Sequence, residues 1–162
     1  MTMGPCTVGF VAHEALIKLC ELRPNVAHAF WRITLIDAAI FRECVANGSR
    51  QGVSRMAHMF CEQAARLGAV GLLGKDFSFQ FPVTQNEIGD AMGLSTVHVN
   101  RSLQELRQKR LVRFDKFTMK VIDWAGLQDA GDFDPAYLFL TKPYLPAGVV
   151  ASAFPVSIGR KI

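Results

Sequence analysis

The sequence predicts a mainly helical protein with a small β component, in which a long helix precedes a small domain of short helices and a β-hairpin. Two observations carry this prediction. Residues 25–46 contain neither Gly nor Pro, whereas residues 84–122 contain closely spaced helix caps, turn residues and strand patterns. With 162 residues, of which 50% are apolar and 20% charged, the chain has the composition of a folded protein with one core and an appendage.

The start of the chain is predicted to form a short strand and a helix. Residues 7–12 are rich in Val and Phe, which favours a strand, and residues 13–22 follow a helical period. Charged residues interrupt the apolar run that a signal peptide would need. The longest apolar stretch elsewhere, residues 144–158, contains two prolines and is shorter than the ~20 residues of a membrane helix. We therefore expect a cytoplasmic protein with no membrane partner.

Residues 24–47 are predicted to form one long helix. Pro24 suits a first helical turn, and the uninterrupted stretch gives about 33 Å of helix. Two apolar stripes lie side by side on it, so the helix needs two partners, and one of these is expected to be a second copy of the chain. The alternative is a helix buried entirely within its own subunit. The predicted dimerisation residues follow 4-3-4-3-4 spacing: Val26, Phe30, Ile33, Asp37, Ile40 and Cys44.

The cysteines do not form a metal-binding pattern. Cys6, Cys20, Cys44 and Cys61 are separated by 14, 24 and 17 residues, with no C-x-x-C pair and no His at zinc-finger spacing. Their neighbours are apolar, which predicts reduced and buried thiols, with a redox role for Cys20 or Cys44 as the alternative. We expect no metal and no cofactor.

Two further elements are predicted ahead of the capped helices. Residues 54–67 resume a helical period that ends at Gly68, and a Gly-rich link follows. Residues 77–81 alternate Phe, Ser, Phe, Gln and Phe, which is typical of a half-buried strand, and Pro82 closes it.

Residues 84–109 are predicted to form two capped helices joined by a tight turn. Thr84 stands three residues before Glu87, which is the capping-box arrangement. Gly93 permits a left-handed turn, and Ser95 caps the second helix. The pattern predicts a helix-turn-helix. We expect the inner side of the first helix to be formed by Ile88, Ala91 and Met92.

The second of these helices has the pattern of a DNA-reading helix. Apolar residues at 4-3 spacing should pack inward, at Val99, Leu103 and Leu106. The exposed start then offers Arg101 as a bidentate donor to guanine O6 and N7, and Thr96 or Val97 for a thymine methyl group. Asn100 or His98 can reach bases or phosphates.

A basic β-hairpin is predicted next to this helix. Residues 111–114 and 118–122 flank a turn at Asp115-Lys116, and the hairpin carries Arg113, Lys116 and Lys120 as phosphate-binding groups. The net charge is +4, and residues 84–120 hold seven basic and four acidic side chains, a net +3. The alternative is an ordinary helical hairpin with a solvated basic face.

The run GLSTVHVNRSL at residues 93–103 resembles the C-terminal domain of the Crp/Fnr family of bacterial regulators, and the likeness extends over about residues 6–138. The resemblance implies three segments. Residues 1–23 would be the remnant of a sensor domain's end, residues 24–47 the dimerisation helix, and residues 48–138 a winged helix-turn-helix domain. Residues 139–162 contain Pro and Gly and match nothing in the family, and we expect them to form a flexible tail.

The resemblance also implies roles for single residues. Arg101 looks like the family's guanine-contacting arginine, Thr96 and Val97 occupy other base-reading positions, and Thr84, Ser95 and His98 resemble phosphate-contacting positions. Thr96-Val97 stands where the best-known members carry Arg-Glu, Arg110 replaces a frequent Gly, and most of the family's β-roll sensor is absent from these residues. The expected DNA-binding set is Thr84, Ser95, Thr96, Val97, His98, Asn100, Arg101, Arg113 and Lys116.

These patterns predict a sequence-specific transcriptional regulator that binds double-stranded DNA as a homodimer. RNA polymerase and full-length family members are further expected partners. The alternative is a truncated interaction module that dimerises with full-length relatives and modulates them without binding DNA. We do not expect an enzyme, because Ser95 and His98 stand at helix-cap spacing and no phosphate loop or zinc motif occurs.

Overall fold

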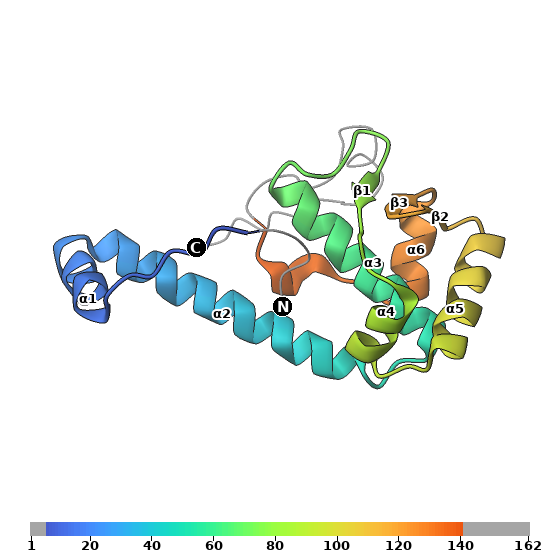
Figure 1. Ribbon diagram of the computed structural model, residues 1–162, viewed down its shortest axis with the longest axis horizontal. Helices are drawn as coiled ribbons and strands as arrows, with labels where there is room; N and C mark the ends of the chain where they lie inside the picture. The colour runs from blue at the N-terminus through green and yellow to red at the C-terminus, as the bar shows by residue number, and fades with distance from the viewer. Residues whose placement is uncertain (1–5, 141–162) are drawn as a thin grey trace, which may run out of the picture.

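The computed structural model describes residues 6–140, which form an elongated molecule with a helical arm and a compact head (Figure 1). The arm consists of α1 (His13–Leu22) and α2 (Pro24–Asn47), and the head begins where α2 ends. The head contains four further α-helices, one 3-10 turn and a three-stranded sheet. The predicted fold class, mainly helical with a small sheet, is confirmed.

The long helix α2 is mostly exposed. Pro24 occupies its first turn and Gly48 follows its end, so the predicted bounds are confirmed. Phe41 and Val45 are 72% and 79% exposed, and Phe30 and Ile33 are also exposed. The helix is therefore not buried within its own subunit.

The head is built around α3 (Gly52–Ala69), whose inner face is buried against α5 (Thr96–Gln108) and α6 (Trp124–Gly131). α3 and α6 approach closely, because a Cβ atom added at Gly131 would lie 2.6 Å from the backbone nitrogen of His58. α4 (Gln85–Met92) packs on α5, and the 3-10 turn η1 (Pro135–Leu138) packs on α2 and α3.

The sheet has the strand order β1-β3-β2, with β1 (Ser78–Gln80), β2 (Val112–Asp115) and β3 (Thr118–Val121) all antiparallel to their neighbours. The strand predicted at residues 77–81 is confirmed over residues 78–80, and the Phe side chains at positions 77, 79 and 81 are buried in the core. The hairpin turn lies at Lys116-Phe117, one residue later than predicted, because Asp115 still pairs with Thr118.

The start of the chain differs from the prediction. Residues 7–12 contain no strand, and the three strands of the described residues pair only with one another. Cys6 and Cys44 are exposed, so the prediction of buried thiols holds only for Cys61, while Cys20 is half-buried. Burial raises the pKa of the Cys61 thiol.

The end of the chain is described only in part. Most of the predicted flexible tail, residues 141–162, lies outside the described residues. The first two residues of this tail are described, and they pack against the rest of the protein. Leu140 contacts the core, and the carbonyl oxygen of Phe139 accepts a hydrogen bond from Arg32 on α2 at 3.2 Å.

No helix within residues 6–140 is long and apolar enough to cross a membrane. The same residues hold no group of three or more His, Cys, Asp or Glu side chains placed to bind a metal ion.

Candidate nucleic-acid interface

The first helix of the predicted motif, α4, begins with a complete capping box. The Thr84 hydroxyl accepts a hydrogen bond from the Glu87 backbone at 3.3 Å, and the Thr84 backbone and hydroxyl both donate to Glu87 Oε2 at 2.8 Å. These bonds from the Thr84 backbone and then its hydroxyl lower the pKa of Glu87. Both Thr84 donors are thus engaged within the cap.

The turn between α4 and α5 has the geometry that the sequence predicts. Gly93 adopts a left-handed conformation with φ of 63°, and the Ser95 hydroxyl accepts a hydrogen bond from the His98 backbone at 3.3 Å. On α4, Ile88 is buried, but Ala91 is exposed, so that part of the prediction is wrong. Gly89 takes the inner position because a Cβ atom there would lie 2.6 Å from the Leu94 carbonyl oxygen.

Helix α5 has one buried and one exposed face. Val99, Leu103 and Leu106 are buried as predicted. Residues 96–98, 100 and 101 are exposed and lie together on the first turns of the helix. Within the described part of the chain, the Arg101 side chain makes no hydrogen bond and no ion pair, so its guanidinium group is available to a ligand.

Two residues at the exposed start of α5 contact α4, and their partners on α4 were not predicted from the sequence. Thr96 Oγ1 lies 2.9 Å from Asn86 Oδ1, and Asn100 Nδ2 lies 3.2 Å from Gln85 Oε1. The Ser95 hydroxyl lies 3.3 Å from His98 Nδ1. Their position in the sequence could have predicted these contacts. Residues 85 and 86 follow the Thr84 cap, and a helix-turn-helix places the first turn of its first helix beside the second helix.

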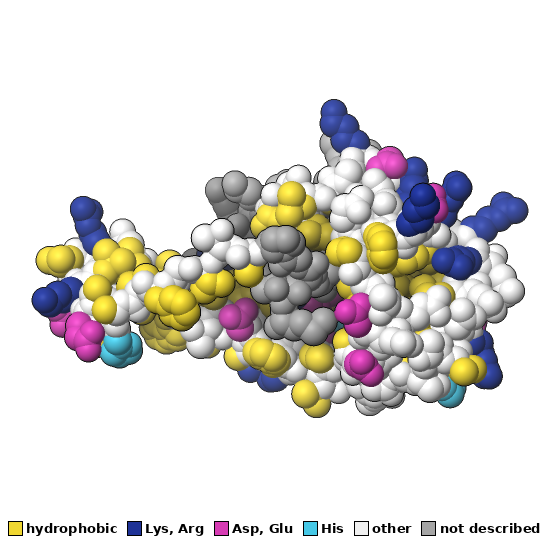
Figure 2. Space-filling view, viewed as in Figure 1, with side chains coloured by type: hydrophobic (Ala, Val, Ile, Leu, Met, Phe, Trp, Pro, Cys, Tyr) yellow, Lys and Arg dark blue, Asp and Glu magenta, His cyan; other side chains and the backbone are white. Residues whose placement is uncertain are grey.

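The hairpin of β2 and β3 carries exposed basic side chains beside α5. Arg113 and Lys116 are exposed, and their side chains have no hydrogen-bond or ion-pair partner among residues 6–140. Lys120 differs from the prediction, because its Nζ atom lies 2.9 Å from Asp76 Oδ2. Hydrogen bonds from the Ser78 side chain and from Lys120 lower the pKa of Asp76 to about 2. Figure 2 shows Lys and Arg side chains gathered over β2, β3 and α5, and hydrophobic side chains spread over the arm.

The entry to this hairpin requires an unusual backbone conformation. Arg110, which the resemblance placed where a Gly is frequent, has φ of 55°. Its backbone nitrogen donates to the Arg107 carbonyl oxygen at 2.9 Å, and the chain then turns into β2. A side-chain-bearing residue is therefore held in the left-handed region at the end of α5.

A half-buried arginine ties the helix-turn-helix to the end of the arm. Arg55 on α3 donates to the carbonyl oxygen of Met92, the last residue of α4, at 2.6 Å. It also donates to the carbonyl oxygens of Gly48 and Arg50 in the turn after α2. One side chain thus satisfies carbonyl groups at the ends of two helices and fixes α4 relative to α2.

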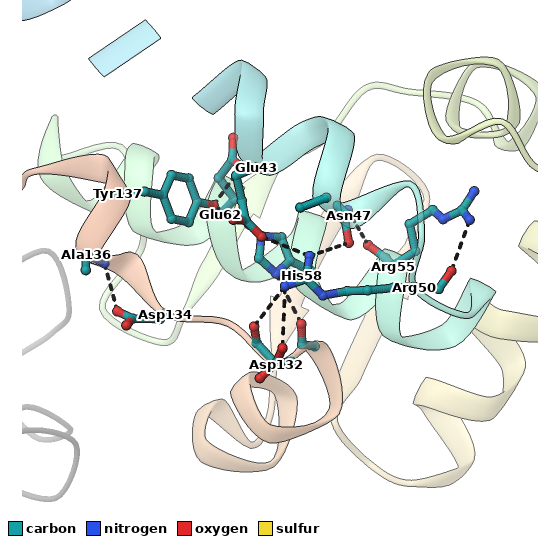
Figure 3. Close-up of polar contacts among 12 residues, drawn as sticks. Glu43, Asn47, Arg50, Arg55, His58, Glu62, Asp132, Asp134, Ala136 and Tyr137 are labelled. Atoms are coloured by element: carbon teal, nitrogen blue, oxygen red, sulfur yellow. Dashed lines mark hydrogen bonds and ion pairs between the residues drawn. The ribbon is translucent and has the colours of Figure 1, made fainter. Parts of the chain in front are cut away.

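A polar cluster surrounds His58 where α2 meets the head (Figure 3). His58 is 2% exposed; its Nδ1 atom lies 3.1 Å from the Gly131 carbonyl oxygen, and its Nε2 atom lies 3.4 Å from Glu43 on α2. Arg50 pairs with Glu43 at 2.9 Å and lies 3.5 Å from Asp132. Burial lowers the pKa of His58, and its effect outweighs the opposing hydrogen bond to Gly131.

The comparisons with known proteins agree with this geometry. Residues 54–130 match the family model described as a Crp-like helix-turn-helix domain. These residues form a Crp-like helix-turn-helix domain. A search of curated proteins found no match.

Solved structures with a similar fold include CprK complexed with OCPA, which is 18% identical, with a TM-score of 0.54 over 73% of this chain and 54% of that chain. TTHB099, a CRP-family transcriptional regulator from Thermus thermophilus, is 21% identical, with a TM-score of 0.45 and coverages of 75% and 56%. The catabolite activator protein of Thermus thermophilus is 24% identical, with a TM-score of 0.38 and coverages of 75% and 54%. The chain spans just over half the length of these proteins.

The Crp-like domain covers α3 to nearly the end of α6, so it includes the capped helices, the sheet and Arg55. The matched domain is thus of the DNA-binding helix-turn-helix kind. α1, α2 and η1 lie outside the matched residues.

Proposed function

We propose that the protein is a sequence-specific transcriptional regulator that places α5 in the major groove of double-stranded DNA. The observation that carries this proposal is the exposed start of α5, where Arg101 has no partner among the described residues while the opposite face is fixed in the core. Arginine pairs bidentately with guanine O6 and N7, which is the commonest specific major-groove contact.

The other predicted residues surround Arg101. Thr96, Val97 and Asn100 share its exposed face, and Arg113 and Lys116 extend the surface as phosphate-binding groups. Ser95 and His98 lie at the helix start, where backbone N–H groups favour a phosphate. Thr84 stays in the predicted set, although a phosphate there would compete with Glu87 for its donors.

We further propose that two copies associate along α2. Phe30, Ile33 and Asp37 of the predicted stripe are exposed, whereas Ile40 packs partly against its own head. The apolar surface then continues through Phe41 and Val45, next to Cys44, and exposed apolar area of this extent favours a partner. A two-fold dimer would present two α5 helices to half-sites ~34 Å apart, one turn of DNA.

The proposal is tested by selection from a pool of random duplexes, followed by sequencing, with wild-type protein and Arg101→Ala across a salt series. We expect a two-fold-symmetric site whose G·C preference is lost in the variant. Retention that is equal for all sequences, equal in the variant and abolished by salt would contradict sequence reading. It would instead favour the interaction module that binds full-length relatives.

The dimer is tested separately by size-exclusion chromatography with light scattering. Ile33→Glu places a charge within the proposed interface and should convert a dimer into a monomer. Lys18→Glu, on the exposed surface of α1, serves as a control for the change in net charge. A wild-type monomer at micromolar concentration would exclude this association.

A further inference from the structure

Two side-chain amides on the first turn of α4 contact the exposed start of α5. Asn86 accepts the hydroxyl proton of Thr96 at 2.9 Å, and Gln85 accepts an N–H of Asn100 at 3.2 Å. Asn86, Thr96 and Asn100 are exposed, and Gln85 is half-buried. Because the capping box at Thr84 fixes the first turn of α4, the side-chain amides of Gln85 and Asn86 are held at defined positions beside α5.

We infer that Asn86 and Gln85 are positioning residues for base reading, Asn86 acting through Thr96 and Gln85 through Asn100. This inference rests on the proposed function, since it concerns the same face of α5. According to this inference, Asn86 and Gln85 of α4 contribute to the DNA sequence preference by fixing the hydrogen-bonding state of Thr96 and Asn100.

The role of Asn86 follows from the proton count of Thr96. A hydroxyl group has one proton to donate and two lone pairs that accept. Once that proton is donated to Asn86, the oxygen can only accept, so it suits the amino group of cytosine or adenine and not the O6 of guanine or the O4 of thymine. Without Asn86 the hydroxyl rotates and can donate as well, and the base preference broadens.

Gln85 acts on Asn100 in a similar way. One N–H of the Asn100 amide is engaged by Gln85, which leaves one N–H and the Oδ1 atom. These two groups are the donor and the acceptor that an asparagine presents to adenine N7 and N6. The contact with Gln85 therefore fixes the orientation of the amide before DNA binds.

The test is a double-mutant cycle read out as base preference. Wild type, Asn86→Ala, Thr96→Val and the double variant are each taken through the random-duplex selection, and the discrimination ratio at every operator position is measured. We expect both single variants to reduce discrimination at the same position by about threefold or more, and the double variant to reduce it no further. Asp90→Ala, an exposed change on α4, is the matched control and should leave every ratio unchanged.

Thermal unfolding shows whether each variant folds; all these positions are exposed, so the midpoints should agree. The inference is overturned if Asn86→Ala leaves the ratios as in wild type, if it changes a different position from Thr96→Val, or if the two effects multiply. A wild-type protein that enriches no site overturns the proposed function and this inference together, whereas an enriched site with independent effects overturns the inference alone.

Discussion

The Nε2 atom of His58 lies 3.2 Å from the hydroxyl oxygen of Tyr137, which links α3 to η1 where both meet the long helix. The two rings are stacked with their centroids 6.1 Å apart. The same hydroxyl donates to Glu62 Oε2 at 2.8 Å, and burial raises the pKa of Tyr137, so the hydroxyl keeps its proton. The single proton of the hydroxyl group goes to Glu62, so towards His58 Nε2 the hydroxyl oxygen can only accept.

Replacing Tyr137 tests how much its hydroxyl group contributes to the free energy of unfolding. Tyr137→Phe removes the hydroxyl and leaves Glu62 Oε2 without this donor, so we expect the free energy of unfolding to fall by about 1–3 kcal/mol. Chemical denaturation measures it. Arg66→Ala removes only the exposed ion pair to Glu62 and should cost less than about 1 kcal/mol. Equal losses in the two variants would contradict the role of the hydroxyl.

Stability should fall as the pH is lowered below the ordinary His range. The folded-state pKa of His58 lies below its unfolded value of about 6.5, because burial disfavours the imidazolium. The unfolded chain therefore binds the proton first, and stability is lost as pH falls from about 6.5 towards the folded-state pKa of His58. Above about pH 6.5 this group causes no loss of stability.

Denaturation at a series of pH values between about 7.5 and 5.5 measures this dependence. His58→Gln should flatten the curve, whatever its effect on stability at neutral pH. His28→Gln changes an exposed histidine on α2 and should retain the wild-type slope. If the wild type and His58→Gln lose stability in parallel, His58 is not the titrating group.

The left-handed residue at the end of α5 offers a stabilising substitution. Arg110→Gly removes the Cβ atom that disfavours φ of 55°, and we expect a gain of about 0.5–1 kcal/mol in the free energy of unfolding. Arg110→Ala removes the same charge but keeps the Cβ atom, so it should give no gain. A gain of equal size in both variants would indicate charge repulsion as the cause.

The proposed dimer predicts an effect at Asp37. This residue is an exposed carboxylate within the apolar stripe of α2, and a polar group at such a position specifies pairing at a cost in affinity. Asp37→Leu should therefore lower the dimer dissociation constant about tenfold or more, as measured by analytical ultracentrifugation. Arg42→Leu, which lies outside both stripes, should leave the constant unchanged.

The helix-turn-helix was predictable because its signals are local. Thr84 and Glu87 are three residues apart, Gly93 and Ser95 lie within the turn itself, and the alternating Phe residues at positions 77, 79 and 81 mark a strand by their spacing alone. The wrong prediction of a strand at the start of the chain involves an interaction between distant segments. A Val- and Phe-rich segment at residues 7–12 forms a strand only if another strand pairs with it, and sequence patterns do not supply that information.

The polar contacts of the head were beyond local analysis for the same reason. Tyr137 is 79 residues from His58, and Asp76 is 44 residues from Lys120, so only the packed fold brings these partners together. The contact between Asn86 and Thr96 spans ten residues across the turn, and the helix-turn-helix geometry alone could have predicted it.

The central claim, that Arg101 reads a guanine, is tested most directly by removing the acceptor atom that it would bind. Duplexes carrying the selected site are made with 7-deazaguanine, which lacks N7, at each guanine in turn, and the affinities of wild type and Arg101→Ala are compared. At one guanine we expect wild type to lose about fivefold or more in affinity, as expected for part of a bidentate contact, while Arg101→Ala loses nothing. Equal losses for the two proteins at every guanine would contradict the claim.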